Sequence, residues 1–352
     1  MSTIDLEILW FCLVAFLFVG YFFLEGFDFG IGMLIHPIGG RDDAKRSAVV
    51  RTIGPVWDAN EVWLITAAGA LFAAFPSWYA TLFSGFYLPL FGILICLILR
   101  VLALEWRSKV DAKRWRTVLD RFTAAASWAV PALWALIFAN MVRGLPVEED
   151  QVLRGTPSMI AGLFNGYALL AVIAFLALFL LHGLAFLRLK TLGTVRDRAE
   201  KFAAPVGIAA AASGLPFLVW TQLSYGKEWT WLLVSLGGIG IALAVGAMIA
   251  HRDGIAFIAT GMAVISAVTL LFASLFPALM PSSIDGVTGL TIRNSASSDY
   301  TLSILTWAAI IATPMVIAYQ AWVYRVFSKR ITAEPGESVT PPVPRWRRKV
   351  RG

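Results

Sequence analysis

The sequence predicts an all-α protein embedded in a membrane, and three observations carry this prediction. Hydrophobic residues make up 59% of the 352-residue chain and charged residues only 14%, whereas soluble domains have about 25% charged residues. The mean hydropathy is +0.75. Apolar segments of about 20 residues, the length that spans a bilayer as a helix, recur throughout. We expect nine such helices, at 8–35, 54–75, 79–104, 119–142, 159–187, 203–223, 229–250, 254–278 and 301–327.

The basic residues predict how these helices are oriented. Lysine and arginine collect in the cytoplasmic loops of membrane proteins, and 24 of the 29 basic residues fall in alternate loops and the tail. We therefore expect the N-terminus outside and the C-terminus in the cytoplasm. The net charge of +7 is attributed to this topology and to anionic lipid, so we expect no binding of nucleic acid.

The first predicted helix carries two acids in its second half. Glu25 and Asp28 are three residues apart and therefore share one helix face. With the N-terminus outside, Asp28 lies one turn nearer the cytoplasm than Glu25. Gly26, Gly30 and Gly32 flank these acids, and small residues of this kind allow close helix packing.

The second and third predicted helices bring further charges to the same level. Asp58 and Glu61 repeat the spacing of three in the first turns of the second helix, where the helix dipole favours a carboxylate. The third helix returns to the same side and carries Arg100 near its end. Four acids and one base are thus expected in the cytoplasmic half of the membrane.

This group of charges indicates a path for protons. An ionisable side chain in hydrocarbon is costly and usually functional. A row of carboxylates from the cytoplasm to mid-membrane can take up protons, because each acid exchanges a proton with water or with its neighbour. The alternative is that Arg100 only neutralises one or two acids in a buried pair that fixes helix register. One base cannot neutralise four acids.

The later helices predict a scaffold. The second half of the chain is nearly free of charge within its predicted spans, and residues 281–300 form a polar outer loop. Cys12 and Cys96 have no metal-site spacing. The three histidines lie at or near cytoplasmic ends of spans, which is typical of interfacial residues; they are His36, His182 and His251. We expect no metal site, no catalytic residue and no haem ligand in this chain.

Several runs of residues are distinctive, and the most specific is Trp57-Asp58-x-Asn60. The other runs are EGFDFGIGML at 25–34, GPVWDANEVWLIT at 54–66, LFAAFP at 71–76, SGFY at 84–87 and PALMPSS at 277–283. Together these runs resemble subunit II of the cytochrome bd quinol oxidase family. The similarity keeps its order along nearly the whole chain and weakens after about residue 330.

The resemblance implies a haem-free subunit of the bacterial cell membrane. Its partner would be a larger subunit I that binds two haems b and one haem d, oxidises menaquinol or ubiquinol, and reduces oxygen to water. Small accessory subunits, lipid and a structural quinone are further possible partners. The implied architecture is two four-helix bundles plus one peripheral helix, and the expected limits are 1–143, 144–280, 281–328 for the outer loop and ninth helix, and 329–352 for a basic proline-rich tail.

The resemblance also implies a role for the acids. The family's proton channel uses acids on the early helices of subunit II, and these match Asp58 and, by alignment, Glu25 and Asp28, with Arg100 beside them. Many relatives carry Gln at the place of Glu61. Two alternatives stay open: a proton-coupled secondary transporter, with a substrate site at broken helices near the midplane, and a purely structural subunit.

Overall fold

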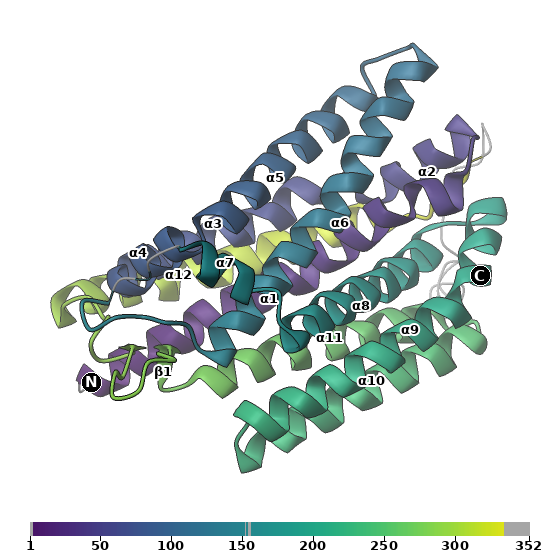
Figure 1. Cartoon of the computed structure of the whole chain (residues 1–352). Coiled ribbons are helices and arrows are strands. Elements are labelled where there is room, and N and C mark those ends of the chain that lie inside the picture. The colour runs from purple at the N-terminus through teal and green to yellow at the C-terminus, as the bar shows by residue number, and fades with distance from the viewer. Residues whose placement is uncertain (1–2, 152, 154–155, 334–352) are drawn as a thin grey trace, which may run out of the picture.

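The computed structural model describes residues 3–151, 153 and 156–333. It is built of long helices that run along a common direction (Figure 1), as predicted. Eight helices of the described residues are long and apolar enough to cross a membrane. They are α1 (Thr3–Gly39), α5 (Tyr87–Arg107), α6 (Lys113–Arg143), α8 (Gly166–Lys190), α9 (Gly193–Tyr225), α10 (Trp231–Ile249), α11 (Asp253–Leu275) and α12 (Asp299–Val326).

The span predicted at 54–75 corresponds to a shorter helix, α3 (Trp57–Ala74), of 18 residues. It has an acid in its first turn and ends before Phe75, where α4 (Pro76–Gly85) begins. Proline at the start of α4 costs no hydrogen bond, because the first N–H groups of a helix have no intrahelical partner. Asp58, Asn60 and Glu61 in its first turns make α3 less apolar than the eight helices above.

One end of the molecule carries Arg41, Lys45 and Arg46 and is called the basic end. At this end α1 ends, α3 begins and the short helix α2 (Asp43–Ile53) lies. The side chain of Asp42 caps α2 by accepting a hydrogen bond from the Ala44 N–H at 3.0 Å. The loops that lead into α6, α9 and α11 lie at the same end, because these helices alternate in direction.

The outer loop lies at the opposite end and packs on this chain. There β1 (Ala278–Met280) pairs in antiparallel fashion with β2 (Leu290–Thr291), and the short helices α7 (Pro157–Gly162) and η1 (Glu228–Thr230) lie in loops. The Ser297 hydroxyl donates to the Ala73 carbonyl at 2.6 Å, and the Leu145 N–H donates to the Pro281 carbonyl at 3.1 Å. The loop therefore covers the ends of α3 and α6.

The helices contact one another in two similar sets. α1 packs against α3 and α6, and α5 packs against α6; in the second set α8 packs against α9 and α11, and α10 against α11. The sets join where α1 meets α8, and each of these two helices also contacts the last helix of the other set. The arrangement agrees with two bundles, for which we propose the limits 1–143 and 144–280.

Two glycines allow α1 and α8 to approach closely. A Cβ atom added at Gly30 would lie 2.0 Å from the Phe179 carbonyl oxygen and 2.9 Å from the Gly183 Cα atom. A Cβ atom at Gly183 would lie 2.5 Å from the Gly30 carbonyl carbon. No side chain fits at either position, so the glycines near the buried acids serve helix packing.

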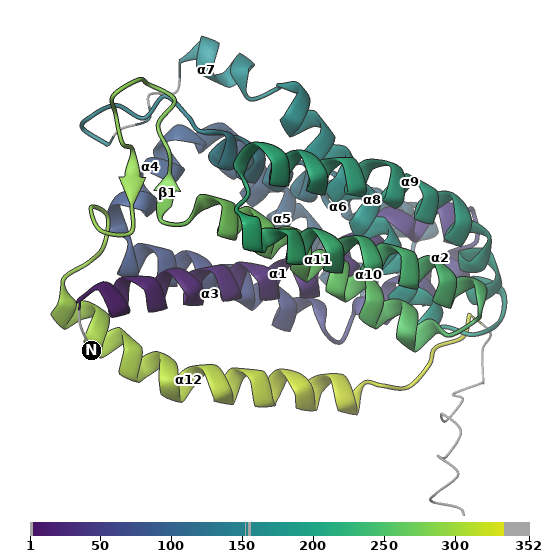
Figure 2. The same ribbon diagram turned by 90° about the horizontal axis from the view of Figure 1, so that it is seen from below.

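The last helix, α12, lies along one side of the molecule beside α1 and α3 (Figure 2). Most of its side chains are exposed, as expected for a peripheral helix. The chain beyond it returns to the bundle, because the Ile331 N–H donates to the Lys190 carbonyl at 2.7 Å and Arg51 donates to the Thr332 carbonyl at 2.9 Å. The predicted tail from residue 334 onward lies outside the described residues.

Candidate functional site

The centre of the site is an ion pair between α1 and α5. Arg100 Nη1 donates to Glu25 Oε2 at 2.9 Å, and both side chains are fully buried. The guanidinium group also lies over the Phe29 ring, 4.7 Å from its centroid, where a cation is attracted by the ring face. The predicted pairing of Arg100 with a neighbouring acid is therefore present for Glu25.

Asp28 lies one turn from Glu25 and is held differently. It is fully buried, and it accepts a hydrogen bond from Asn60 Nδ2 of α3 at 2.7 Å. The Asn60 carbonyl oxygen accepts in turn from Gln320 Nε2 and from the Tyr324 hydroxyl of α12, each at 2.8 Å. Asn60 thus joins α1, α3 and α12 at one buried point.

The remaining two acids lie toward the basic end. Glu61 is half-buried and lies within electrostatic range of both Arg100 and Asp58. Asp58 is exposed, and its side chain forms no ion pair within the described part of the chain. Trp57, which precedes it, is buried. The acids therefore form a series from an exposed group at the basic end to fully buried groups inside.

Several polar atoms at the centre have no hydrogen-bond partner among the described residues: Glu25 Oε1, Asp28 Oδ1, and Arg100 Nε and Nη2. Buried polar atoms in proteins nearly always have a partner, either protein or ordered water. A buried site with this many donors and acceptors offers the two to four polar contacts that an internal water needs.

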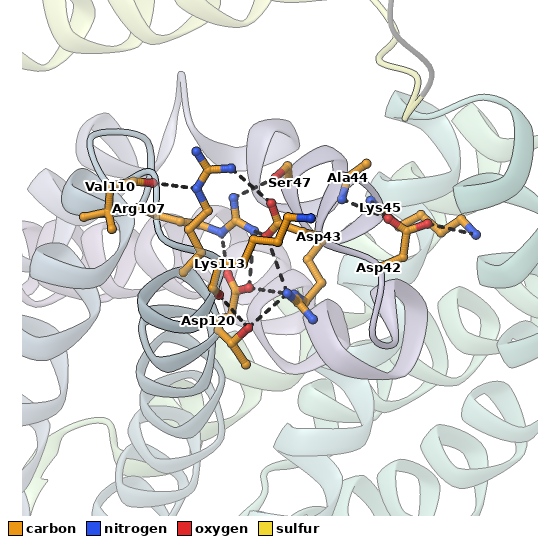
Figure 3. Close-up of polar contacts among 12 residues, drawn as sticks. Asp42, Asp43, Ala44, Lys45, Ser47, Arg107, Val110, Lys113 and Asp120 are labelled. Carbon is orange, nitrogen blue, oxygen red and sulfur yellow. Dashed lines mark hydrogen bonds and ion pairs between the residues drawn. The ribbon is translucent and has the colours of Figure 1, made fainter.

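A second charge cluster, which the sequence prediction did not include, closes the basic end of the first bundle (Figure 3). Asp120 of α6 is fully buried between two arginines. Arg46 Nε donates to it at 2.8 Å, and Arg107 donates to both of its oxygens. Arg107 also donates to Asp43 of α2 at 3.1 Å. The cluster ties α2, α5 and α6 together.

The charges around Asp43 change its acidity. Burial by itself raises the pKa of this carboxyl group, but the hydrogen bond from Arg116 and the charges of Arg107, Arg116 and Arg46 outweigh it and hold the pKa below its usual value. The Arg116 hydrogen bond is 3.1 Å long. Asp43 is therefore ionised at neutral pH. No sequence pattern pairs the members of this cluster, because Arg46 and Asp120 are 74 positions apart.

The second bundle has a similar buried charge cluster, formed by residues just outside the spans predicted for it. Asp253, at the start of α11, is buried and accepts from Arg196 Nη2 at 2.7 Å. The fully buried Arg188 of α8 lies 3.1 Å from the other Asp253 oxygen. Each bundle thus holds one buried aspartate between two arginines at the basic end.

The three histidines lie in different elements, His36 in α1, His182 in α8 and His251 after α10, and His36 Nε2 has no hydrogen-bond partner among the described residues. His182 is fully buried within α8, which corrects the expectation that it lies at the interface. Its Nδ1 atom bonds to the Thr260 hydroxyl at 2.7 Å and its Nε2 atom to the Phe23 carbonyl at 3.1 Å. Both ring nitrogens are therefore occupied. His251 is exposed and lies 3.5 Å from Glu200. Among the described residues no group of three or more His, Cys, Asp or Glu could hold a metal ion.

Comparison with known proteins relates the whole chain to one family. Residues 6–327 match the family model described as cytochrome bd terminal oxidase subunit II. The chain is 39% identical to cytochrome bd ubiquinol oxidase subunit 2 of Bacillus subtilis, over 93% of this chain and 97% of that protein. It is 30% identical to cytochrome bd-I ubiquinol oxidase subunit 2 of Escherichia coli, over 96% and 99%.

The fold has a match among solved structures as well. A chain of the bd oxidase from Geobacillus thermodenitrificans superimposes with a TM-score of 0.73 over 92% of this chain and 98% of that chain. The sequence identity is 18%, so this likeness concerns the fold alone.

Proposed function

Because the chain belongs to the cytochrome bd terminal oxidase subunit II family, we propose that its buried acids supply protons to oxygen reduction in the oxidase complex. The chain is a subunit of a quinol-oxidising enzyme with oxygen as the acceptor. Such a subunit implies a partner, subunit I, and haems within the complex. The chain is therefore assigned to this enzyme and not to the class of proton-coupled secondary transporters.

The observation that carries the proposal is the graded burial of four acids along one direction. Asp58 is exposed at the basic end, Glu61 is half-buried, and Asp28 and Glu25 are fully buried. We propose that the basic end faces the cytoplasm, since lysine and arginine favour that side. A proton would then enter at Asp58 and pass by Glu61 to Asp28 and Glu25.

The side chains around the Glu25–Arg100 pair suit the transfer of protons. Reduction of oxygen to water consumes protons, and the electrons come from quinol. Arg100 offsets the charge of Glu25, so the site tolerates one ionised acid in a place where an unpaired ion is costly. The unpaired carboxylate oxygens are positions that internal water can bridge.

We further propose that this chain is haem-free and supports assembly of subunit I, which would hold the two haems b and the haem d. The bonds of His182 to Thr260 and Phe23 do not fit axial ligation of iron. An apolar groove between α1 and α12, about 470 Å³ in volume and lined in part by Trp63 and Phe257, has room for a lipid chain or a quinone tail.

The test is steady-state oxygen uptake by the assembled complex with excess quinol, combined with proton uptake from the cytoplasmic side. Asp58→Asn and Glu25→Gln keep the shape of each side chain but cannot ionise. We expect uptake to fall about tenfold or more in each, the range that positioned proton transfer usually contributes, with normal haem content. Glu61→Gln should have a smaller effect, because many relatives carry Gln there.

Glu105→Gln is the matched control. Glu105 lies exposed near the end of α5 and pairs only with Lys109 in the described residues, so its loss should leave the rate unchanged. Wild-type rates in both Asp58→Asn and Glu25→Gln would remove the proton path from this subunit and leave it a structural role.

A further inference from the structure

We infer that Gln320 and Tyr324 of the peripheral helix α12 are positioning residues for Asp28, acting through Asn60. The inference rests on the proposed function of the buried acids and assigns α12 a part in it. Neither side chain touches Asp28 through a hydrogen bond in the described structure; both bond to the amide that does.

The position of these two residues on α12 is unusual. The helix is exposed along most of its length, and its buried residues are Leu302, Gln320 and Val323. Gln320 is thus the polar member of a small buried set. Tyr324 is half-buried and lies one turn further on, on the same face. Both side chains donate to one atom, Asn60 Oδ1.

The hydrogen-bonding capacity of an amide explains why this matters. A side-chain amide has one acceptor oxygen and one NH₂ donor. Two donors at 2.8 Å occupy the Asn60 oxygen, so the NH₂ group must face Asp28. In the flipped amide the oxygen would face the Asp28 carboxylate and the bond to an ionised Asp28 would be lost, while Gln320 and Tyr324 could then bond to the NH₂ group only as acceptors. Gln320 and Tyr324 therefore fix the direction in which Asn60 donates.

This direction controls the environment of one acid in the series. The charged or titratable groups around Asp28 are Glu25 on its own helix, Arg100 of α5, Glu61 of α3 and Tyr324 of α12. The NH₂ group of Asn60 donates the hydrogen bond that holds Asp28 Oδ2 in place. Without a fixed Asn60, the carboxylate loses both its donor and its defined position relative to Glu25.

If α12 only anchors the subunit, the effect of removing these hydrogen bonds should not depend on Asp28. Substituting both residues in the wild type and in Asp28→Asn separates this role from the inferred one. In the complete oxidase complex, the pair Gln320→Leu with Tyr324→Phe should lower kcat for oxygen uptake about three- to tenfold, because a hydrogen bond to a charged group is lost. The quinol KM and the haem spectrum should stay as in the wild type. Tyr319→Phe is the control, since Tyr319 lies on the same helix with its side chain exposed.

The same pair is then introduced into Asp28→Asn. If the residues act through Asp28, they should cause no further loss of kcat there, because mutations that act on one interaction are not additive. Losses that multiply in the Asp28→Asn background, or a fall in haem content that parallels the fall in rate, would overturn the inference in favour of anchoring.

Failure of the inference and failure of the proposed function give different results. A slow Asp28→Asn variant together with a fully active pair overturns the inference alone. A fully active Asp28→Asn overturns the inference, and the proposed function fails as well only if Asp58→Asn and Glu25→Gln are also fully active. If the pair does not assemble, Tyr324→Phe alone removes one donor and keeps the ring that packs against Phe27, and a wild-type kcat in that variant would count against the inference.

Discussion

At the scale of single residues, the buried ions differ in how they are compensated. Arg100, Asp120 and Arg188 are fully buried, and each has an opposite charge within 3.1 Å. Asp28 is fully buried as well, yet its hydrogen bond comes from the neutral amide of Asn60. The hydrogen bond that the structure gives Asp28 thus comes from a neutral group, which suits the uptake and release of protons proposed for it.

The arginine cluster at the basic end should make stability depend on pH. The pKa of Asp43 is held below its usual value, so this group stabilises the folded chain when ionised and loses that contribution as pH falls through its folded pKa. Asp43→Asn should lower the unfolding temperature of the complex at neutral pH. The difference from the wild type should shrink below about pH 4, the ordinary range of aspartate. A difference that stays constant down to pH 3 would exclude this origin.

The sequence indicated the acids but not their partners. The Glu25–Arg100 pair could be expected because both residues lie at one depth in apolar helices. The Asp120 cluster could not, since Arg46 lies 74 residues away on a short helix whose rotation no hydrophobic pattern determines. The two donors from α12 could not be predicted either. Gln320 is 260 residues from Asn60, and the sequence of its helix indicates exposure to lipid along the whole length.

At the scale of elements, the close approach of α1 and α8 sets the position of the acids on α1. Gly30 lies two residues after Asp28, and its Cα faces the backbone of α8 without space for a methyl group. Gly32 packs equally tightly against α6, since a Cβ there would lie 1.9 Å from the Ser127 hydroxyl oxygen. The two glycines thus allow α1 to pack closely against both α8 and α6.

Gly30→Ala should therefore destabilise the complex. The added methyl group would overlap the Phe179 carbonyl, and overpacking of this kind usually costs about 1–3 kcal/mol. We expect a lower unfolding temperature and a lower yield of haem-containing complex. Gly246→Ala in α10 is the control, because a Cβ there meets nothing within 4 Å and alanine favours a helix. Equal stability of the two variants would contradict the packing role.

The predicted helices agree with the structure where a long apolar segment determines the helix. They differ where a single residue interrupts the helix. Eight of the nine expected spans appear as long apolar helices. The segment predicted at 54–75 is the single helix α3, whereas the span predicted at 79–104 is interrupted at Phe86, between α4 and α5. Hydropathy averages over such a break, because the residues on both sides are apolar.

At the scale of the whole molecule, the two bundles are joined by polar bonds as well as by packing. His182 of α8 bonds to Thr260 of α11 and to the Phe23 carbonyl of α1, and its ring stacks on Phe257 with centroids 4.8 Å apart. A residue in this position serves cohesion of the subunit.

His182→Phe should test this assignment. It removes the hydrogen bonds of the ring to the Thr260 hydroxyl and the Phe23 carbonyl, and each such bond contributes about 0.5–1.5 kcal/mol, while Thr260 can still donate to the Phe257 carbonyl. We expect the unfolding temperature of the complex to fall by several degrees, with all haem bands retained in the complex that assembles. His251→Phe, at the surface, should change neither. Loss of one haem band at full subunit content would show that His182 is an iron ligand.

The contact of α12 with Asn60 also has a consequence for biosynthesis. The ribosome completes Asn60 long before residues 320 and 324, which lie in the last helix of the described chain. Until α12 enters the bilayer, the Asn60 amide lacks both donors and that side of the acid series is uncovered. A chain that stops before α12 therefore lacks two of the hydrogen bonds to Asn60 and leaves this polar side of α3 without its cover.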